Sequence, residues 1–288
     1  MKLAVIGSGT MGSGIVQTFA SCGHDVCLKS RTQGAIDKCL ALLDKNLTKL
    51  VTKGKMDEAT KAEILSHVSS TTNYEDLKDM DLIIEASVED MNIKKDVFKL
   101  LDELCKEDTI LATNTSSLSI TEIASSTKRP DKVIGMHFFN PVPMMKLVEV
   151  ISGQLTSKVT FDTVFELSKS INKVPVDVSE SPGFVVNRIL IPMINEAVGI
   201  YADGVASKEE IDEAMKLGAN HPMGPLALGD LIGLDVVLAI MNVLYTEFGD
   251  TKYRPHPLLA KMVRANKLGR KTKISDWSVA TYFWSHRK

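Results

Sequence analysis

The chain has 288 residues, of which 44% are hydrophobic and 24% charged, and its formal net charge is −2 at pH 7. This composition is ordinary for a globular protein, and the length suits two domains. The near-neutral charge argues against a general role on nucleic acid or on a membrane surface, and no apolar run reaches the roughly 20 residues that span a bilayer.

The first predicted element is a short strand, residues 2–6, which runs into a G-x-G-x-x-G turn and then a helix. Gly7 permits the tight turn, Gly9 lets a pyrophosphate approach the backbone, and Gly12 lets the helix pack close to the strand. A second strand, residues 25–29, follows, so the context favours a dinucleotide site over a glycine-rich turn without a ligand. The predicted cofactor contacts here are Gly7, Gly9, Thr10, Met11 and Gly12.

A helical hairpin is predicted over residues 35–68. Apolar residues recur at steps of three and four from Ile36 to Leu50, Gly54 ends this helix, and Asp57 caps the next one. A βαβ crossover needs only one helix, so the hairpin is an insertion that is either structural or reaches toward a ligand. The lysines of its turn are most simply read as solvated surface.

Further strands are predicted at residues 81–86, 109–113 and 133–136, with helices between them. This alternation predicts a parallel sheet with both faces covered, and ligands bind such sheets beyond the carboxyl ends of the strands. Ser116, His137 and Asn140 follow these strand ends, which indicates a site there.

The composition changes near Pro182, after which only helices are predicted: residues 184–201, a helix opened by a Ser207–Glu210 capping box, residues 231–248 and residues 258–268. We therefore predict an α/β fold, with a Rossmann-type doubly wound sheet in residues 1–183 and an all-helical C-terminal domain in residues 184–288.

His137 is the leading candidate for a general acid and base, because an ordinary histidine titrates near neutral pH. Twelve residues later, Glu149 could orient the histidine ring and stabilise its charged form. The alternatives are a hydrogen-bonded core histidine and a surface carboxylate on an edge strand. Asn187 and Arg188, on an apolar helix, could equally satisfy a domain interface.

Four segments together resemble the 3-hydroxyacyl-CoA dehydrogenase family, and most of all its bacterial 3-hydroxybutyryl-CoA dehydrogenases. They are N-T-S-S at residues 114–117, H-F-F-N-P at 137–141, K-L-V-E-V at 146–150 and S-P-G-F-V-V-N-R at 181–188. The resemblance implies a cytoplasmic enzyme of fatty acid metabolism or butyrate fermentation. Such an enzyme interconverts acetoacetyl-CoA and 3-hydroxybutyryl-CoA with a nicotinamide cofactor and dimerises through its C-terminal helices.

The resemblance also implies roles for individual residues. His137 exchanges the proton of the 3-hydroxyl group, Glu149 orients His137, and Ser116 and Asn187 hydrogen-bond the substrate oxygens. The positions that match the nicotinamide half of the cofactor site are Ala86, Glu89, Lys94, Asn114, Ser116, Asn140 and Lys271. On the hairpin, Lys53 matches a lysine that meets the phosphates of coenzyme A, and Asn46 matches a further substrate position.

The sequence departs from the family pattern at two places. After residue 274 the tail, which contains Trp277 and Trp284, is unrelated to the family's usual ending and puts the placement of Lys271 in doubt. At the end of the second strand, Ser30 stands where family members commonly carry an aspartate that binds the adenosine ribose of NAD. Ser30 removes the repulsion of a 2′-phosphate and Arg31, aided by Lys29, can attract one, so we predict that NADP is preferred over NAD.

Two other functions are open at this stage. A β-hydroxyacid dehydrogenase with a catalytic lysine shares the glycine turn and a helical second domain, but residues 184–201 contain no lysine. A non-enzymatic dinucleotide-binding protein would not need the set of Ser116, His137, Glu149 and Asn187.

The four cysteines show no C-x-x-C pair or metal-ligand spacing, so we predict reduced thiols and no metal site.

Overall fold

The computed structural model describes residues 1–273 and 277; the remainder of the atypical tail, including Trp284, lies outside the described residues. The chain divides into two compact units, Met1–Ser181 and Pro182–Lys288. This division falls two residues before the predicted boundary. Each unit has its own hydrophobic core and is described by itself.

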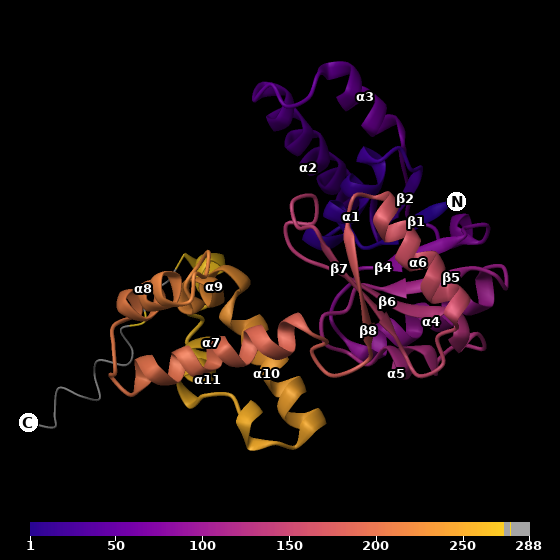
Figure 1. Cartoon of the computed structure of the whole chain (residues 1–288). Helices are drawn as coiled ribbons and strands as arrows, with labels where there is room; N and C mark the ends of the chain where they lie inside the picture. The colour runs from indigo at the N-terminus through magenta and orange to yellow at the C-terminus, as the bar shows by residue number, and fades with distance from the viewer. Residues whose placement is uncertain (274–276, 278–288) are drawn as a thin grey trace, which may run out of the picture. The chain divides into compact units, whose positions relative to one another are not determined.

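The first unit contains an eight-stranded sheet in the order β3-β2-β1-β4-β5-β6-β7-β8. The strands are β1 (Leu3–Ile6), β2 (Val26–Lys29), β3 (Val68–Thr71), β4 (Leu82–Glu85), β5 (Ile110–Thr113), β6 (Val133–Phe138), β7 (Leu147–Ser152) and β8 (Val174–Ser179). All neighbours pair in parallel except β6 and β7, which are antiparallel. The predicted Rossmann-type α/β fold is confirmed (Figure 1).

Helices connect and cover these strands, and the apolar residues of four of them, the first three and the last, form one core with the sheet. They are α1 (Thr10–Ser21), α2 (Gln33–Thr52), α3 (Glu58–Ser66), α4 (Met91–Leu104), α5 (Ile120–Ala124) and α6 (Lys158–Ser170), with 3₁₀ turns η1 (Glu75–Leu77) and η2 (Pro130–Lys132). Helices α2 and α3 form the hairpin, which Figure 1 shows in indigo. Gly54 adopts a positive φ of 65° after α2, and the Asp57 carboxylate accepts a hydrogen bond from Thr60 N at the start of α3.

The second unit is helical throughout its described residues. Its helices are α7 (Val186–Ala202), α8 (Lys208–Gly218), α9 (Pro225–Ile232), α10 (Leu234–Phe248) and α11 (Pro257–Arg264), with 3₁₀ turns η3 (Thr251–Tyr253) and η4 (Arg270–Thr272). The predicted capping box of Ser207 and Glu210 is present at the start of α8. Apolar residues of α7, α9, α10 and α11 form the core of this unit.

The prediction of a single helix over residues 231–248 is wrong. Gly233 has a φ of 103°, a conformation that a helix cannot contain, and it separates α9 from α10.

Among the described residues, no single helix is long and apolar enough to cross a membrane. Only α9 and α10 taken together reach that length and composition, and they are bent by 98°.

Candidate active site

His137 and Glu149 form a buried pair between two neighbouring strands. The antiparallel register of β6 and β7 places the two residues directly opposite each other. The His137 ring nitrogen Nδ1 lies 2.7 Å from a Glu149 carboxylate oxygen, and the two residues are only 3% and 1% exposed. Because β7 is flanked by β6 and β8, the interpretation of Glu149 as an edge-strand surface residue is wrong.

This pairing determines which histidine nitrogen is available for chemistry. An ionised carboxylate accepts a hydrogen bond, so Nδ1 carries the proton and Nε2 is the atom that can exchange one with a substrate. The Phe139 ring packs on the imidazole with the ring centroids 4.5 Å apart, which helps to hold the ring orientation. The arrangement can therefore serve as an oriented general acid and base.

The glycine turn has the geometry of a phosphate-binding turn. A Cβ on Gly12 would lie 1.9 Å from the carbonyl oxygen of Gly7, so only glycine fits where α1 crosses the end of β1. A Cβ on Gly9 would meet nothing within 4 Å, so the backbone there faces open space. Gly9 also caps α1 without a side-chain hydrogen bond, which leaves the first N–H groups of the helix for a ligand.

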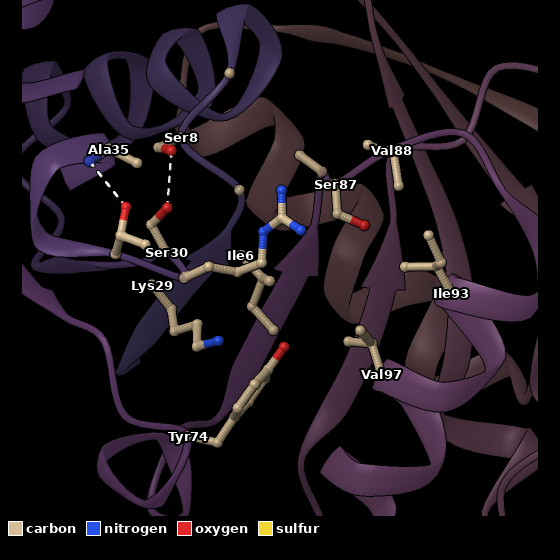
Figure 2. Close-up of a pocket in the computed structure, with 15 residues that line it drawn as sticks. Ile6, Ser8, Lys29, Ser30, Ala35, Tyr74, Ser87, Val88, Ile93 and Val97 are labelled. Atoms are coloured by element: carbon tan, nitrogen blue, oxygen red, sulfur yellow. Dashed lines mark hydrogen bonds between the residues drawn. The ribbon is translucent and has the colours of Figure 1, made fainter. Parts of the chain in front are cut away.

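A pocket of about 490 Å³ lies beside this turn, at the carboxyl ends of β1, β2 and β4 (Figure 2). Its lining residues are Ile6–Gly9, Lys29–Thr32, Ala35, Tyr74, Ala86–Val88, Ile93 and Val97. Five predicted cofactor residues line it: Gly7, Gly9, Ser30, Arg31 and Ala86. Thr10, Met11 and Gly12 form the adjoining first turn of α1.

The pocket wall formed by the end of β2 is positively charged. Lys29 is 3% exposed, and its Nζ lies 3.2 Å from the centre of the Tyr74 ring. Burial, and after it the charge of Arg31, lowers the pKa of Lys29 below its ordinary value. Within the described residues, Lys29 pairs with no carboxylate, and none of the pocket-lining residues is acidic. Ser30 Oγ lies 2.8 Å from Ser8 Oγ.

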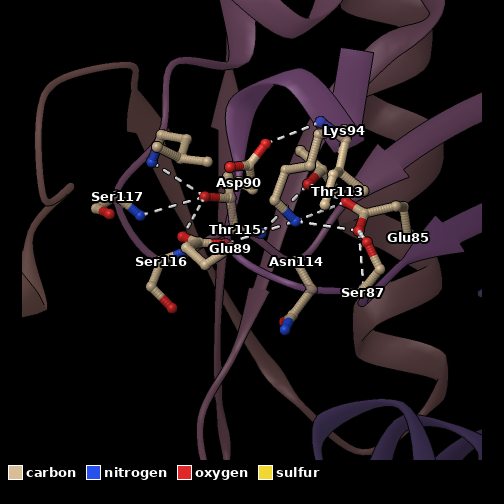
Figure 3. A network of polar contacts seen from close by, with 12 residues as sticks. Glu85, Ser87, Glu89, Asp90, Lys94, Thr113, Asn114, Thr115, Ser116 and Ser117 are labelled. Carbon is tan, nitrogen blue, oxygen red and sulfur yellow. Dashed lines mark hydrogen bonds and ion pairs between the residues drawn. The ribbon is translucent and has the colours of Figure 1, made fainter. Parts of the chain in front are cut away.

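A polar network shares Ser87 with the lining of the pocket (Figure 3). Lys94, on α4, is 1% exposed; its ammonium contacts both carboxylate oxygens of Glu85 and lies 3.5 Å from Glu89. Glu89 accepts hydrogen bonds from Thr115 Oγ1 and from the backbone N–H of Ser116, at 2.6 and 2.7 Å. Glu89 thus contacts the two other predicted residues, Lys94 and Ser116, and Lys94 extends the network to Glu85, which was not predicted.

The segments after β5 and β6 are also tied together. The Asn114 side-chain oxygen accepts a hydrogen bond from Phe138 N, next to His137. Asn140 is exposed and precedes a cis bond to Pro141. The ammonium of Lys173, a buried residue, donates to the carbonyls of Val142 and Met145 and so holds the loop that follows Asn140. Lys173 was not predicted, because nothing in its sequence position distinguishes it from a surface lysine.

The hairpin separates the two residues predicted there. Lys53 is exposed and lines a shallow depression of about 430 Å³ along one face of α2, whose other lining residues are Asp44, Lys45, Thr48, Lys49 and Thr52. Asn46 is not part of that face; its side chain donates to Gln17 Oε1 on α1 at 3.4 Å. The structure thus places Lys53 at an exposed depression and gives Asn46 a contact within the fold.

Two predicted residues belong to the second unit. Asn187 lies in the first turn of α7 and is 9% exposed. Beside it, Arg188 is exposed; its guanidinium stacks over the Phe248 ring and donates to Tyr253 Oη, contacts within its own unit. Lys271 lies in η4, where its Nζ is 2.9 Å from Asp235.

Comparisons with known proteins place the chain in one family. Residues 2–181 match the family described as 3-hydroxyacyl-CoA dehydrogenase, NAD binding domain, and residues 183–276 match the C-terminal domain of the same family.

Individual relatives span nearly the whole chain. A 3-hydroxybutyryl-CoA dehydrogenase of Clostridioides difficile is 98% identical over 274 residues, which are 95% of this chain and 98% of that protein. The human mitochondrial hydroxyacyl-coenzyme A dehydrogenase is 44% identical over 94% of this chain and 88% of its own. The crystal structure of an (S)-3-hydroxybutyryl-CoA dehydrogenase from Ralstonia eutropha superposes with a TM-score of 0.91 at 52% identity, covering 94% and 96% of the two chains.

Proposed function

This chain belongs to the 3-hydroxyacyl-CoA dehydrogenase family, and from that membership we propose that it interconverts acetoacetyl-CoA and (S)-3-hydroxybutyryl-CoA. It is an oxidoreductase with an NAD-binding Rossmann domain. The curated relative that is 98% identical is named for 3-hydroxybutyryl-CoA, which supports this substrate. The buried His137–Glu149 pair is the structural observation on which the proposed chemistry rests.

In the proposed mechanism, His137 Nε2 takes the proton of the 3-hydroxyl group during oxidation and returns it during reduction. A nicotinamide cofactor, when bound, would supply the hydride for reduction of the same carbon and accept it in oxidation. Glu149 keeps the imidazole in the tautomer whose Nε2 can accept a proton in this exchange. Ser116 and Asn187 hydrogen-bond the substrate oxygens, and so hold the reacting carbon in one orientation.

The glycine turn and the pocket beside it suit the pyrophosphate and the adenosine of a dinucleotide. Glycine at position 12 and open space at Gly9 are the two steric requirements of such a turn, and both are met. Ala86, Glu89, Lys94, Asn114, Asn140 and Lys271 are proposed for the nicotinamide half. Since Lys94 is almost fully buried, we infer that it acts there largely through its carboxylate partners.

We further propose that NADP is preferred over NAD. The pocket wall carries Ser30, Arg31 and the buried Lys29, and no acidic residue is among those that line the pocket. A carboxylate at position 30 would repel a 2′-phosphate, whereas two nearby cations attract it. Both effects favour the phosphorylated cofactor.

The hairpin is the proposed site for the coenzyme A phosphates. Lys45 and Lys49 on α2 and Lys53 at its C-cap line one shallow depression, and the single carboxylate that also lines it, Asp44, pairs with Lys61, so the surface is positively charged. Such a surface binds phosphate weakly and in a salt-dependent way. Asn46 is kept in the proposal only as a residue that fixes α2 against α1.

We also propose a homodimer in the cytoplasm. The second unit exposes apolar side chains, including Ile189, Val205 and Leu217, each more than two-thirds exposed in the single chain. Large exposed apolar residues of this kind mark interaction surfaces when they cluster. Sedimentation at micromolar concentration tests the dimer, and a monomer there would contradict it.

One assay tests the proposed activity. The purified protein is given acetoacetyl-CoA with NADPH or NADH, and the loss of reduced-cofactor absorbance is followed. We expect turnover with both cofactors and a higher specificity constant for NADPH. Bound cofactor without turnover would instead indicate a non-enzymatic dinucleotide-binding protein.

A lysine-dependent β-hydroxyacid dehydrogenase is disfavoured by α7, which contains no lysine.

A further inference from the structure

Glu85 is fully buried at the carboxyl end of β4 and therefore cannot touch a ligand itself. Its carboxylate accepts hydrogen bonds from the backbone N and Oγ of Ser87, from Lys94 Nζ and from Thr113 Oγ1. These donors come from three different segments: the turn after β4, the first part of α4 and the end of β5. One carboxylate thus joins three elements that border the site.

The contacts of Glu85 lead in two directions. Ser87 lines the dinucleotide pocket, so the first branch fixes the pocket wall. The second branch passes through Lys94 to Glu89, which accepts hydrogen bonds from Thr115 and from the backbone N–H of Ser116 (Figure 3). That branch therefore fixes the loop that carries Ser116.

We propose that Glu85 is a positioning residue that holds the dinucleotide pocket and the Ser116 loop in a fixed relation to each other. A buried carboxylate saturated by good donors is rigid, and removing its charge leaves Lys94 as a buried cation with only the more exposed Glu89 beside it. The pocket wall and the loop then lose their shared anchor. Cofactor affinity and acyl-CoA recognition both depend on this one residue.

The test compares Glu85→Gln with variants that cut one branch each. Ser87→Ala removes a donor on the pocket side, and Thr115→Val removes a donor on the loop side. Two quantities are measured: the dissociation constant of NADPH and of NADH from cofactor fluorescence without acyl-CoA, and the KM for acetoacetyl-CoA at saturating cofactor. Thermal unfolding is followed in parallel.

We expect Glu85→Gln to raise both constants by roughly tenfold, the size of effect expected for loss of one charge-assisted hydrogen bond. Ser87→Ala raises only the dissociation constants, and Thr115→Val raises only the KM. Glu85→Gln with both constants within twofold of the wild type would overturn the proposal.

Glu180→Gln is the matched control for general loosening of the unit. Glu180 is another carboxylate with several donors, from Ser119 and Thr121, and it does not belong to the network. This variant is expected to unfold at a lower temperature with both constants unchanged. If it raises them as much as Glu85→Gln does, the effect is not specific to Glu85 and the proposal fails.

A double variant keeps the test decisive if Glu85→Gln does not fold. Glu85→Gln/Lys94→Met removes both buried charges, a change that often preserves stability. Because Lys94 is itself proposed at the cofactor site, the double variant is compared with Lys94→Met alone: weaker dinucleotide binding than in Lys94→Met supports the proposal, and equal dissociation constants overturn it. The inference rests on the proposed function only through the KM for acetoacetyl-CoA. A wild type that binds dinucleotide but does not reduce acetoacetyl-CoA refutes the proposed function. In that case the dissociation constants of the dinucleotides still test the role of Glu85.

Discussion

His137 and Glu149 are cross-strand neighbours in the antiparallel β6–β7 pair, and this register brings Nδ1 to 2.7 Å from the carboxylate. The sheet, and not a flexible loop, sets their distance. Both residues also lie at the edge of the sheet that is formed by the carboxyl ends of β6 and of the strands that run parallel to it. Ligands bind at this edge in such folds.

Replacing His137 by alanine should reduce turnover by roughly 10²- to 10⁴-fold. The variant lacks the group that accepts the proton of the 3-hydroxyl group in oxidation and returns it in reduction. Dinucleotide binding should be unchanged, since the glycine turn is separate. His67 offers a matched control: its Nδ1 also lies 2.7 Å from a carboxylate, that of Asp25, but at the surface. His67→Ala should keep full turnover. A His137→Ala enzyme with a tenth of normal turnover would refute the assignment.

Glu149→Gln tests the orienting role separately. The amide preserves the shape of the side chain but removes the negative charge that accepts the Nδ1 hydrogen bond. We expect kcat to fall on the order of 10²-fold with little change in the KM for either substrate. Steady-state kinetics at saturating cofactor measure this. A selective rise in KM would instead indicate that Glu149 supports substrate binding.

Ser30→Asp should move the cofactor preference from NADPH toward NADH. The new carboxylate would lie on the pocket wall near Arg31 and repel the 2′-phosphate, which should lower the specificity constant for NADPH by roughly tenfold or more. The specificity constants of both cofactors are compared in the wild type and the variant. A wild type that prefers NADH tenfold would contradict the proposed preference.

The contribution of Lys29 should appear as a pH dependence. Burial lowers its pKa from the ordinary 10.5, so in the free protein the ammonium loses its proton at a lower pH than an exposed lysine does. A bound 2′-phosphate favours the protonated form, and NADPH affinity should therefore decline as pH rises through that lowered pKa. NADH affinity should decline less.

The measurement is the ratio of the two dissociation constants between neutral and alkaline pH. In Lys29→Met the ratio should no longer change over this range, because the titrating group is absent. The same pH dependence in Lys29→Met as in the wild type would remove Lys29 from the phosphate site.

Lys53→Ala should raise the KM for acetoacetyl-CoA and leave the dissociation constant of the cofactor unchanged. Because Lys53 is exposed, the difference from the wild type should shrink with added salt, since screening acts over about 10 Å at 0.1 M. Lys55→Ala is the control, because Lys55 is exposed nearby but does not line the same face of α2. Equal KM values for Lys53→Ala and the wild type at low salt would show that Lys53 is a solvated surface residue that does not contact coenzyme A.

Much of the first unit could be predicted because its central strands and its glycine turn have strong local patterns. The two edge strands were missed for a physical reason. β3 reads V-S-S-T and β8 contains a proline, and most of their residues are partly or fully exposed, so neither has the apolar run of a buried strand. The break at Gly233 was missed because apolar residues continue on both sides of it.

The candidate site was predictable only where chemistry and position coincide in the sequence. His137 and Glu149 have functional side chains near strand ends and a family pattern around them. Glu85 ends a predicted strand like any polar residue, and only the fold shows that Ser87, Lys94 and Thr113 converge on it. The side chain of Asn46 likewise turns to α1 because of helix packing that no local pattern encodes.

The contact between Gly7 and Gly12 has a consequence for the cost of binding. A Cβ at position 12 would lie 1.9 Å from the carbonyl oxygen of Gly7, so the turn packs directly against the start of α1, and Gly7 N donates to Lys29 O at 2.9 Å. The turn is therefore ordered when the domain folds, before any dinucleotide arrives. Little conformational entropy is then lost when the dinucleotide binds. Most of the free energy of the pyrophosphate contacts therefore contributes to the binding affinity. Any side chain at position 12 would have to open this turn and would weaken both dinucleotides equally.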